Sequence, residues 1–302
     1  MIKRRILPVA MPPYRVALIS ILSLLLFVIL LAEFWPSVAQ RLENLSTIQL
    51  GLLASLIAGL FTAVGAIPIF FIKQLSRSVE DTLMGFGAGV MLAATAYELV
   101  IPAIDHADAL FGPAWVTILV LTAGIASGGL LLLALHKYVP HEHFILGPES
   151  GADRLKIRRV WLFIMAIALH NLPEGLAVGV GFGGNDLSSG FALAIGIGLQ
   201  NMPEGLVVAI ALLSLGYSRM TAFGVTLLTG LVQPLGGLIG VVAVSLVDLM
   251  MPFALAFAAG AMLFVISHEI IPESHSKGHQ SKATFGVLLG FVVMAAIGIA
   301  LD

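Results

Sequence analysis

HNLPEG at residues 170–175 and QNMPEG at residues 200–205 are two copies of one polar motif, and each interrupts an otherwise apolar stretch. Residues i and i+4 of a helix share a face about 5–6 Å apart, so each copy predicts two polar side chains side by side. The proline removes a backbone N–H, which kinks the helix and frees a carbonyl one turn earlier. Ionisable groups at membrane depth are costly and usually line a substrate pathway. We therefore interpret the two motifs as functional.

The side chains paired by this spacing are His170 with Glu174 and Gln200 with Glu204. If the two helices face each other, the four make a cage for one divalent cation. Two carboxylates balance its charge and offset the cost of placing a dehydrated ion in a low dielectric. A single buried pair of this kind is equally well explained by a structural hydrogen bond. The recurrence of the motif favours a metal site.

Composition identifies an integral membrane protein. The chain has 302 residues, of which 59% are hydrophobic and 11% charged, whereas soluble domains contain about 25% charged residues. The apolar runs approach the roughly 20 residues that span a bilayer as a helix, and they are too long for the strands of a membrane barrel. We expect an all-α polytopic protein with nine helices, at about 15–35, 48–72, 82–104, 114–136, 160–182, 189–213, 220–247, 252–272 and 283–301.

Charge distribution predicts the orientation. If the N-terminus is cytoplasmic, nine spans place every Lys and Arg except Arg41 on the cytoplasmic side, as the positive-inside rule requires, and the C-terminus outside. The external connections carry Asp105, Asp108, Asp186 and Asp248 instead. The basic residues are thus explained by topology and do not indicate nucleic acid.

The segment 1–40 has two interpretations. Lys3–Arg5, an apolar stretch and the small residues at 37–39 are typical of a cleavable signal peptide. The apolar run from Val16 to Ala32 exceeds the usual 7–15 residues of such peptides, which favours an extra transmembrane helix. Both interpretations leave the downstream topology unchanged.

The chain contains no cysteine, so thiolate ligation is excluded. Any metal must bind histidine, carboxylate, amide, carbonyl or thioether groups. This ligand set suits Zn²⁺, Cd²⁺, Fe²⁺ or Mn²⁺ and does not choose among them. No prosthetic group is expected.

The motifs resemble those of the ZIP family of divalent-metal transporters (zinc/iron-regulated transporter-like proteins), in its bacterial branch. Three further elements match in order: Met91 and Glu98 in one apolar run, Gln233-Pro234 in another, and HEIIPE at 268–273. The resemblance covers about residues 48–302. It implies an eight-helix core in a three-two-three arrangement with inverted repeats, and 1–40 would precede this core. The connection at about 137–159 would be a cytoplasmic loop.

A polar stripe is expected on the helix before the motifs. Met91, Thr95, Glu98 and Asp105 share one helix face through offsets of four, three and seven. Family resemblance places Met91 at the cage as a thioether ligand, although packing in the core explains a helical methionine equally well. Glu98 is the more strongly indicated functional residue, and Asp105 would mark the external entry.

The resemblance also suggests a second, adjoining metal position formed by Asn171, Asn201 and Gln233, which would share Glu174 and Glu204. Here the sequence departs from the family, because bacterial relatives typically carry acidic side chains at the positions of Asn201 and Gln233. Two dications would bring four positive charges against two or three carboxylates. We therefore do not expect a stable binuclear centre.

Metal leaving the membrane could be received by histidines and glutamates at the cytoplasmic end. The alternative is ordinary polar loop chemistry. The residues concerned are His268, Glu269, Glu273, His275 and His279, together with His136, His141, Glu142 and His143 from another connection.

The sequence thus predicts a transporter, not an enzyme, that carries divalent transition metal, zinc first, from outside into the cytoplasm across a bacterial inner membrane. The resemblance implies elevator-type alternating access, in which the helices holding Glu98 and the two motifs move as a unit against a scaffold. Metal binding could expel a proton shared by Glu174 and Glu204. Its expected partners are divalent metal ions and lipid, with a homodimer left open.

Three rival functions compete with transport by a carrier. A selective metal channel would use the same ligands. An intramembrane metallohydrolase is prompted by HEIIPE, which lacks the second histidine of His-Glu-x-x-His. A non-transporting metal sensor would need a soluble effector domain, for which the sequence provides no candidate.

Overall fold

The structure is a computed structural model that describes residues 29, 30, 32–35, 37, 38, 40–42, 44–72, 75–138, 151–183, 187–246, 248–276 and 278–301. Within these residues the chain is helical and forms no strand, and seven helices are long and apolar enough to cross a membrane. The prediction of an all-α polytopic membrane protein is confirmed. The extra N-terminal helix and its signal-peptide alternative fall almost entirely outside the described residues.

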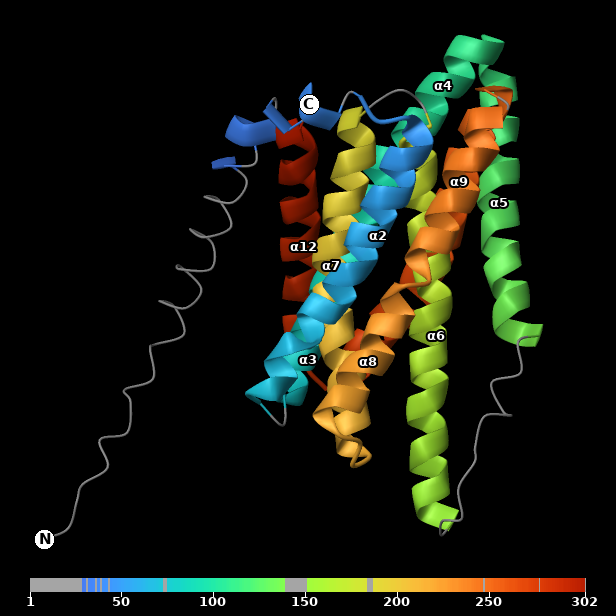
Figure 1. The fold of residues 1–302 in the computed structure, drawn as a ribbon. Helices are drawn as coiled ribbons and strands as arrows, with labels where there is room; N and C mark the ends of the chain where they lie inside the picture. The colour runs from blue at the N-terminus through green and yellow to red at the C-terminus, as the bar shows by residue number, and fades with distance from the viewer. Residues whose placement is uncertain are drawn as a thin grey trace, which may run out of the picture.

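Eight helical units follow one another, and consecutive units run in opposite directions (Figure 1). They correspond to the eight predicted spans from residue 48 onward. A short turn, η3 (Asp248–Met250), precedes the seventh unit. The units are α2 with η1 (Thr47–Ala66, Ile67–Phe70), α3 with η2 and α4 (Arg77–Ala94, Thr95–Val100, Ile101–Phe111), α5 (Ala114–Tyr138), α6 (Gly151–Gly181), α7 (Leu187–Ser214), α8 with α9 (Arg219–Gly230, Gln233–Leu246), α10 with η4 and α11 (Met251–Val265, Ile266–Ile270, Ile271–His275), and α12 (Gln280–Leu301).

Two helices extend beyond their apolar runs. The unit that begins at Arg77 was expected only from residue 82, and α6 begins at Gly151 although 137–159 was predicted to be a loop. Hydropathy detects only the part of a helix that lies in lipid, whereas charged residues such as Glu, Lys and Arg are good helix formers. The connection between α5 and α6 is therefore shorter than predicted.

The predicted span at 220–247 is confirmed at Arg219–Leu246, but it is not a single continuous helix. It consists of α8 and α9, separated by a turn at Leu231 and Val232. Pro234 cannot donate to the preceding turn, which places the start of a new helix at Gln233. By contrast, α6 and α7 remain helical through Pro173 and Pro203. The break leaves the first backbone N–H groups of α9 without intrahelical acceptors, at a point inside the fold.

Two units contain a turn of π-helix just before a proline, in η2 and in η4. The segments around them are related in sequence, because AGVML at 88–92 precedes Pro102 and AGAML at 259–263 precedes Pro272. A π-turn holds one residue more than an α-turn and so rotates all later side chains around the axis. This rotation changes which face Glu98 occupies relative to Met91.

The helices group into two bundles. We call α2, α6, α7, α8 and α9 the first bundle, and α3, α4, α5, α10, α11 and α12 the second bundle. The most extensive helix pairs are α2 with α7 and α6 with α9 in the first, and α3 with α12 and α5 with α10 in the second. The bundles meet mainly along α3 and α7, α6 and α10, and α7 and α12.

Glycines allow close backbone approach inside each bundle. A Cβ at Gly175 would overlap the carbonyl of Gln233, and one at Gly205 would overlap the carbonyl of Thr62. In the second bundle a Cβ at Gly290 would overlap the carbonyl of Phe86. Across the bundles, a Cβ at Gly87 would lie 3.7 Å from the Gln200 side chain, an ordinary contact. Inside each bundle the helix backbones are therefore in close contact, whereas side chains form the interface between the two bundles.

The expectation that the helices of Glu98 and of the two motifs move as a unit stays a prediction. Glu98 lies in η2 and belongs to the second bundle, whereas both motifs lie in the first. The helix of Glu98 packs closely against α12 through glycines of both helices. Glu98 and the two motifs therefore do not form one packing unit.

Candidate metal site

The motif side chains lie buried where α6, α7 and α9 meet. His170, Asn171 and Glu174 come from α6, and Gln200, Asn201 and Glu204 come from α7, while Gln233 begins α9. All seven side chains are at most 4% exposed. The carboxyl groups of Glu174 and Glu204 are close enough for their charges to interact, as expected if the two motifs face each other.

Glu174 is the centre of the site. Gln233 Nε2 donates to Glu174 Oε2 at 2.6 Å, and Gln200 and His170 lie beside the same carboxyl group. The start of α9 adds favourable electrostatics, because the N-terminus of a helix carries partial positive charge. Gly175 makes this arrangement possible, since a side chain there would push α6 away from Gln233.

The amide nitrogens are occupied by protein acceptors. Asn171 Nδ2 donates to Ile167 O at 2.9 Å, Asn201 Nδ2 to Ala58 O at 2.8 Å, and Gln200 Nε2 to Asn201 Oδ1 at 2.8 Å. An amide whose nitrogen is fixed in this way has a fixed oxygen as well. The oxygens of Asn171 and Gln200 are thereby held as acceptors in the site.

Buried acceptors without a donor gather at this place. Within the described residues, six buried oxygen atoms of the site have no hydrogen-bond partner, and neither does His170 Nδ1. Buried polar groups are normally paired, so such a concentration points to a missing cation. Carboxylate and carbonyl oxygens with one imidazole are a donor set that divalent cations accept. The oxygens are those of Thr62 Oγ1, Asn171 Oδ1, Glu174 Oε1, Gln200 Oε1, Glu204 Oε1 and Gln233 Oε1.

The predicted cage is not assembled around a single point. Among the described residues, no group of three or more His, Asp or Glu side chains is arranged to hold a metal ion together. The reason lies in His170, whose Nε2 is 2.8 Å from Glu269 Oε2 of η4. This pair crosses from the first bundle to the second, and it draws the imidazole toward Glu269.

The predicted stripe on the preceding helix is only partly reproduced. Met91 is buried, and Gly87, one turn before it, faces the Gln200 side chain, so Met91 lies on the face of α3 that is directed at the site. Further along the same unit, Glu98 lies between α7 and α12. Ser189 Oγ donates to Glu98 Oε2 at 3.1 Å, and Glu98 lines a cavity of about 310 Å³ beside α12. Asp105 is exposed in α4.

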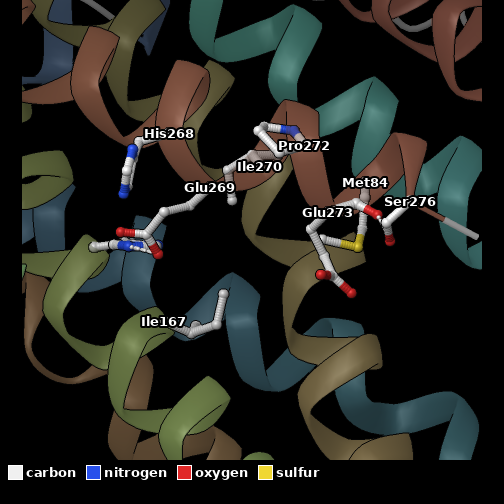
Figure 2. A pocket seen from close by; sticks show the side chains of 9 residues that line it. Met84, Ile167, His268, Glu269, Ile270, Pro272, Glu273 and Ser276 are labelled. Atoms are coloured by element: carbon white, nitrogen blue, oxygen red, sulfur yellow. Dashed lines mark hydrogen bonds and ion pairs between the residues drawn. The ribbon is translucent and has the colours of Figure 1, made fainter.

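A cavity of about 380 Å³ adjoins His170 on the side where α11 ends and α3 begins (Figure 2). Its walls include Met84, His268, Glu269 and Glu273. The π-turn η4 places Glu269 deep in this cavity, and Glu273 lies one helical turn further out (Figure 2). These residues therefore line one continuous opening that leads away from the motif residues.

Other predicted exit residues are placed differently. His275 contacts Ile271 O and Thr284 Oγ1 at 3.0 and 3.1 Å, within the second bundle and outside the cavity wall. His279 Nδ1 lies 3.0 Å from Asp81 Oδ2, a fully buried carboxylate that no sequence motif indicated. The side chains of His136, His141, Glu142 and His143 lie outside the described residues.

Sequence reasoning missed the contribution of α2. Thr62 Oγ1 is one of the unpaired oxygens, and Ala58 O fixes Asn201. Neither residue stands out in the sequence, since a threonine in an apolar helix usually bonds its own backbone. The spacing of Ala58, Gly59 and Thr62 is the only signal, because small residues mark a face of close helix contact.

Comparison with known proteins identifies the family of the chain. The family description "ZIP Zinc transporter" matches residues 146–298, which include both motifs and HEIIPE. Zinc transporter GufA of Myxococcus xanthus is 45% identical over 253 residues, covering 83% of this chain and 98% of that protein. Zinc transporter ZIPB of Bordetella bronchiseptica is 41% identical over 240 residues, covering 80% and 77%. Human zinc transporter ZIP11 is 34% identical, covering 86% and 99%.

The chain belongs to the ZIP family. The resemblance inferred from the motifs is thereby confirmed, and so is the assignment to a multi-pass membrane protein of a transporter family. In this ZIP chain the seven polar residues of the motifs and of α9 converge at one buried place.

Proposed function

We propose that this protein carries divalent transition metal, zinc first, across a membrane into the cytoplasm. The observation that carries the proposal is the group of buried, unpaired oxygens around Glu174 and Glu204. Paired carboxylates supply two negative charges for one dication, and His170 supplies a nitrogen ligand that zinc favours. The two similar bacterial proteins, GufA and ZIPB, are named zinc transporters.

The hydrogen bonds within the site favour the binding of one metal ion at a time. Asn201 accepts from Gln200 and donates to Ala58 O, and the nitrogen of Gln233 is bound to Glu174. These bonds occupy Asn201 Oδ1 and Glu174 Oε2, two oxygens that a second adjoining cation would need as ligands. The neutral amides also leave the charge of a second dication uncompensated.

The distribution of charge supports the orientation on which the proposed direction of transport rests. Arg77, Lys137, Arg219 and Lys282 lie at the same end of the helical units, which the positive-inside rule assigns to the cytoplasm (Figure 1). The cavity lined by Glu269 and Glu273 lies toward that end. We assign it as the release path and the opposite end, with exposed Asp105, as the entry.

Alternating access would come from movement of the first bundle against the second. Backbone contacts at glycines make each bundle rigid, while side chains form the interface between them. The metal ligands of both motifs would travel together, and Met91, Glu98 and Glu269 would belong to the stationary partner. The His170–Glu269 contact would then exist on one side of the movement only.

Metal uptake into proteoliposomes by the purified protein tests the proposal. Glu174→Ala and Glu204→Ala should each nearly abolish uptake, because each leaves a dication one carboxylate short in a low dielectric. Thr117→Ala, a buried substitution in α5 away from the motifs, serves as the control for folding. Wild-type uptake in a folded Glu174→Ala/Glu204→Ala protein would contradict the site. Competition among Zn²⁺, Cd²⁺, Fe²⁺ and Mn²⁺ in the same assay establishes preference.

The alternative of a selective channel predicts different kinetics. A carrier saturates at low flux and depends strongly on temperature, because each ion requires a conformational cycle. A pore conducts many ions in one open conformation and shows neither property. The same proteoliposomes measured at several temperatures and metal concentrations distinguish the two.

A further inference from the structure

Asp81 of α3 is a fully buried carboxylate that the metal site does not use. Its two oxygens differ in their surroundings. Oδ2 lies 3.0 Å from His279 Nδ1, whereas Oδ1 has no hydrogen-bond partner among the described residues. A buried carboxylate is costly unless it is paired, and loss of its partner leaves the charge uncompensated. The contact with His279 therefore offsets much of the cost of this burial.

The contact joins two segments of the second bundle that are distant in sequence. Asp81 lies in the second turn of α3, and His279 immediately precedes α12. An ionised carboxylate can only accept, so His279 Nδ1 carries a proton and donates the hydrogen bond. The start of α3 thereby fixes the end of the connection between α11 and α12.

This connection begins at the wall of the cavity of about 380 Å³ that is assigned to metal release, which we call the release cavity. Glu273 and Ser276 both line the release cavity (Figure 2), and Ser276 Oγ donates to Glu273 O at 2.8 Å. Gly278 has a φ of +92°, a left-handed conformation that favours glycine. His279 follows it, three residues after Ser276. The contact with Asp81 is therefore close in sequence to this wall.

His279 is held beside the release cavity without lining it. Its side chain is 35% exposed, yet it is not one of the residues of the cavity wall. Met84 does line the cavity, and it lies three residues after Asp81, on the same face of α3. This face of α3 thus forms one wall through Met84 and fixes the segment of another wall through Asp81.

We propose that Asp81 is a positioning residue for metal release, which acts through His279 on Glu273 and does not touch the metal. Glu269 and Glu273 are the acidic residues of the cavity wall, so an ion that leaves Glu269 reaches Glu273 next. Glu273 lies in the last turn of its helical unit, and helix ends fray unless they are held. The inference rests on the proposed function, because that function assigns the release path.

Two neighbouring contacts are less suited to this role. Lys282 Nζ donates to Ser78 Oγ at 2.7 Å, and His275 Nε2 lies 3.1 Å from Thr284 Oγ1. Both contacts are exposed, and water replaces an exposed hydrogen bond at little cost. A buried carboxylate has no such substitute. The pair of Asp81 and His279 therefore contributes the stronger constraint.

Stopped-flow release of bound Zn²⁺ from the purified full chain into excess chelating dye tests the proposal. His279→Ala should slow release about tenfold, because a hydrogen bond to a charged group is lost. The equilibrium affinity for zinc should stay unchanged, since the metal ligands are intact and a misplaced wall slows entry and exit equally. His279→Asn should release zinc at the wild-type rate, because its amide nitrogen replaces Nδ1 as the donor.

The asparagine variant separates positioning from ligation. A histidine that received the metal would lose this role in both variants, so equal slowing by His279→Asn and His279→Ala would overturn the proposal. Asp81→Asn/His279→Ala removes the uncompensated charge and should release zinc as slowly as His279→Ala. Thermal unfolding verifies that each variant is folded.

A double-mutant cycle identifies the residue through which the contact acts. Glu273→Gln should slow release, and His279→Ala should add nothing in that background. Lys282→Met removes only an exposed contact between α3 and α12, and it should behave as wild type. Additive slowing by His279→Ala and Glu273→Gln, or undiminished release by folded His279→Ala, would contradict the assignment. Zinc that binds to and leaves the wild-type protein supports the proposed function, so these negative results would refute the present inference alone.

Discussion

At the residue scale, we expect Gln233 to limit how much positive charge the site accepts. Its nitrogen donates to Glu174 at 2.6 Å, so Gln233→Glu replaces this hydrogen bond by two facing carboxylates. We expect the variant to bind a second metal ion, because a cation relieves the repulsion, and to release metal more slowly, because tighter ground-state binding does not speed transport. Metal content per protomer and uptake rate measure the two effects.

The matched control for this prediction is Gln280→Glu, which adds the same charge at an exposed position at the start of α12. It should leave stoichiometry unchanged. Two tightly bound ions per wild-type protomer would contradict the expected limit from charge balance.

Glu98 and Asp105 should respond differently to the loss of charge. Glu98 is 7% exposed and bonded to Ser189, whereas Asp105 is exposed to solvent. Glu98→Gln should reduce uptake at every ionic strength, since salt screens a buried charge only weakly. Asp105→Asn should reduce only the capture of dilute metal at low salt. If Asp105→Asn is the more damaging at high salt and saturating metal, the assigned depths are wrong.

Much of the site could be predicted from residues alone. The repeated motif identified His170, Glu174 and Glu204, because polar side chains at i and i+4 in an apolar helix are too costly to recur without a bound partner. It could not reveal that His170 contacts Glu269 or that Thr62 joins the site. Those contacts join helices distant in sequence, and only packing determines them.

At the scale of elements, hydropathy predicted the eight helical units but not their irregularities. The break before Gln233 and the π-turns of η2 and η4 change hydrogen bonding, not polarity, so an apolar run conceals them. The stripe of Met91, Glu98 and Asp105 was predicted on a regular helix, so it did not include the π-turn that contains Glu98. A regular 3.6-residue period cannot anticipate an inserted residue.

We expect that one added methyl group at Gly175 disturbs the close packing of α6 against α9. Gly175→Ala would place a Cβ against the carbonyl of Gln233, and overpacking of this kind costs about 1–3 kcal/mol. Gly224→Ala in α8 meets nothing within 4 Å and should be neutral or stabilising by up to about 1 kcal/mol. We expect a lower melting temperature and reduced uptake for Gly175→Ala only. Equal stability of the two variants would contradict the close packing of α6 on α9.

At the scale of the whole molecule, the proposed alternating access requires that the two bundles move relative to each other. The chain has no native cysteine, so an introduced pair forms the only disulfide. Gly196 of α7 faces the Met294 side chain of α12 across the bundle interface, while Gly51 of α2 faces Val241 of α9 inside the first bundle. These positions allow a cross-link between the bundles to be compared with one inside a bundle.

Oxidation of Gly196→Cys/Met294→Cys should stop uptake, and reduction should restore it, because the disulfide joins bodies that must separate during each cycle. Oxidation of Gly51→Cys/Val241→Cys should leave uptake nearly unchanged, since both residues move together. Metal binding should survive in both oxidised proteins, which separates a blocked movement from a damaged site. Undiminished uptake through the fully oxidised first pair would mean that ions pass with the bundles fixed. That result would favour a channel over a carrier.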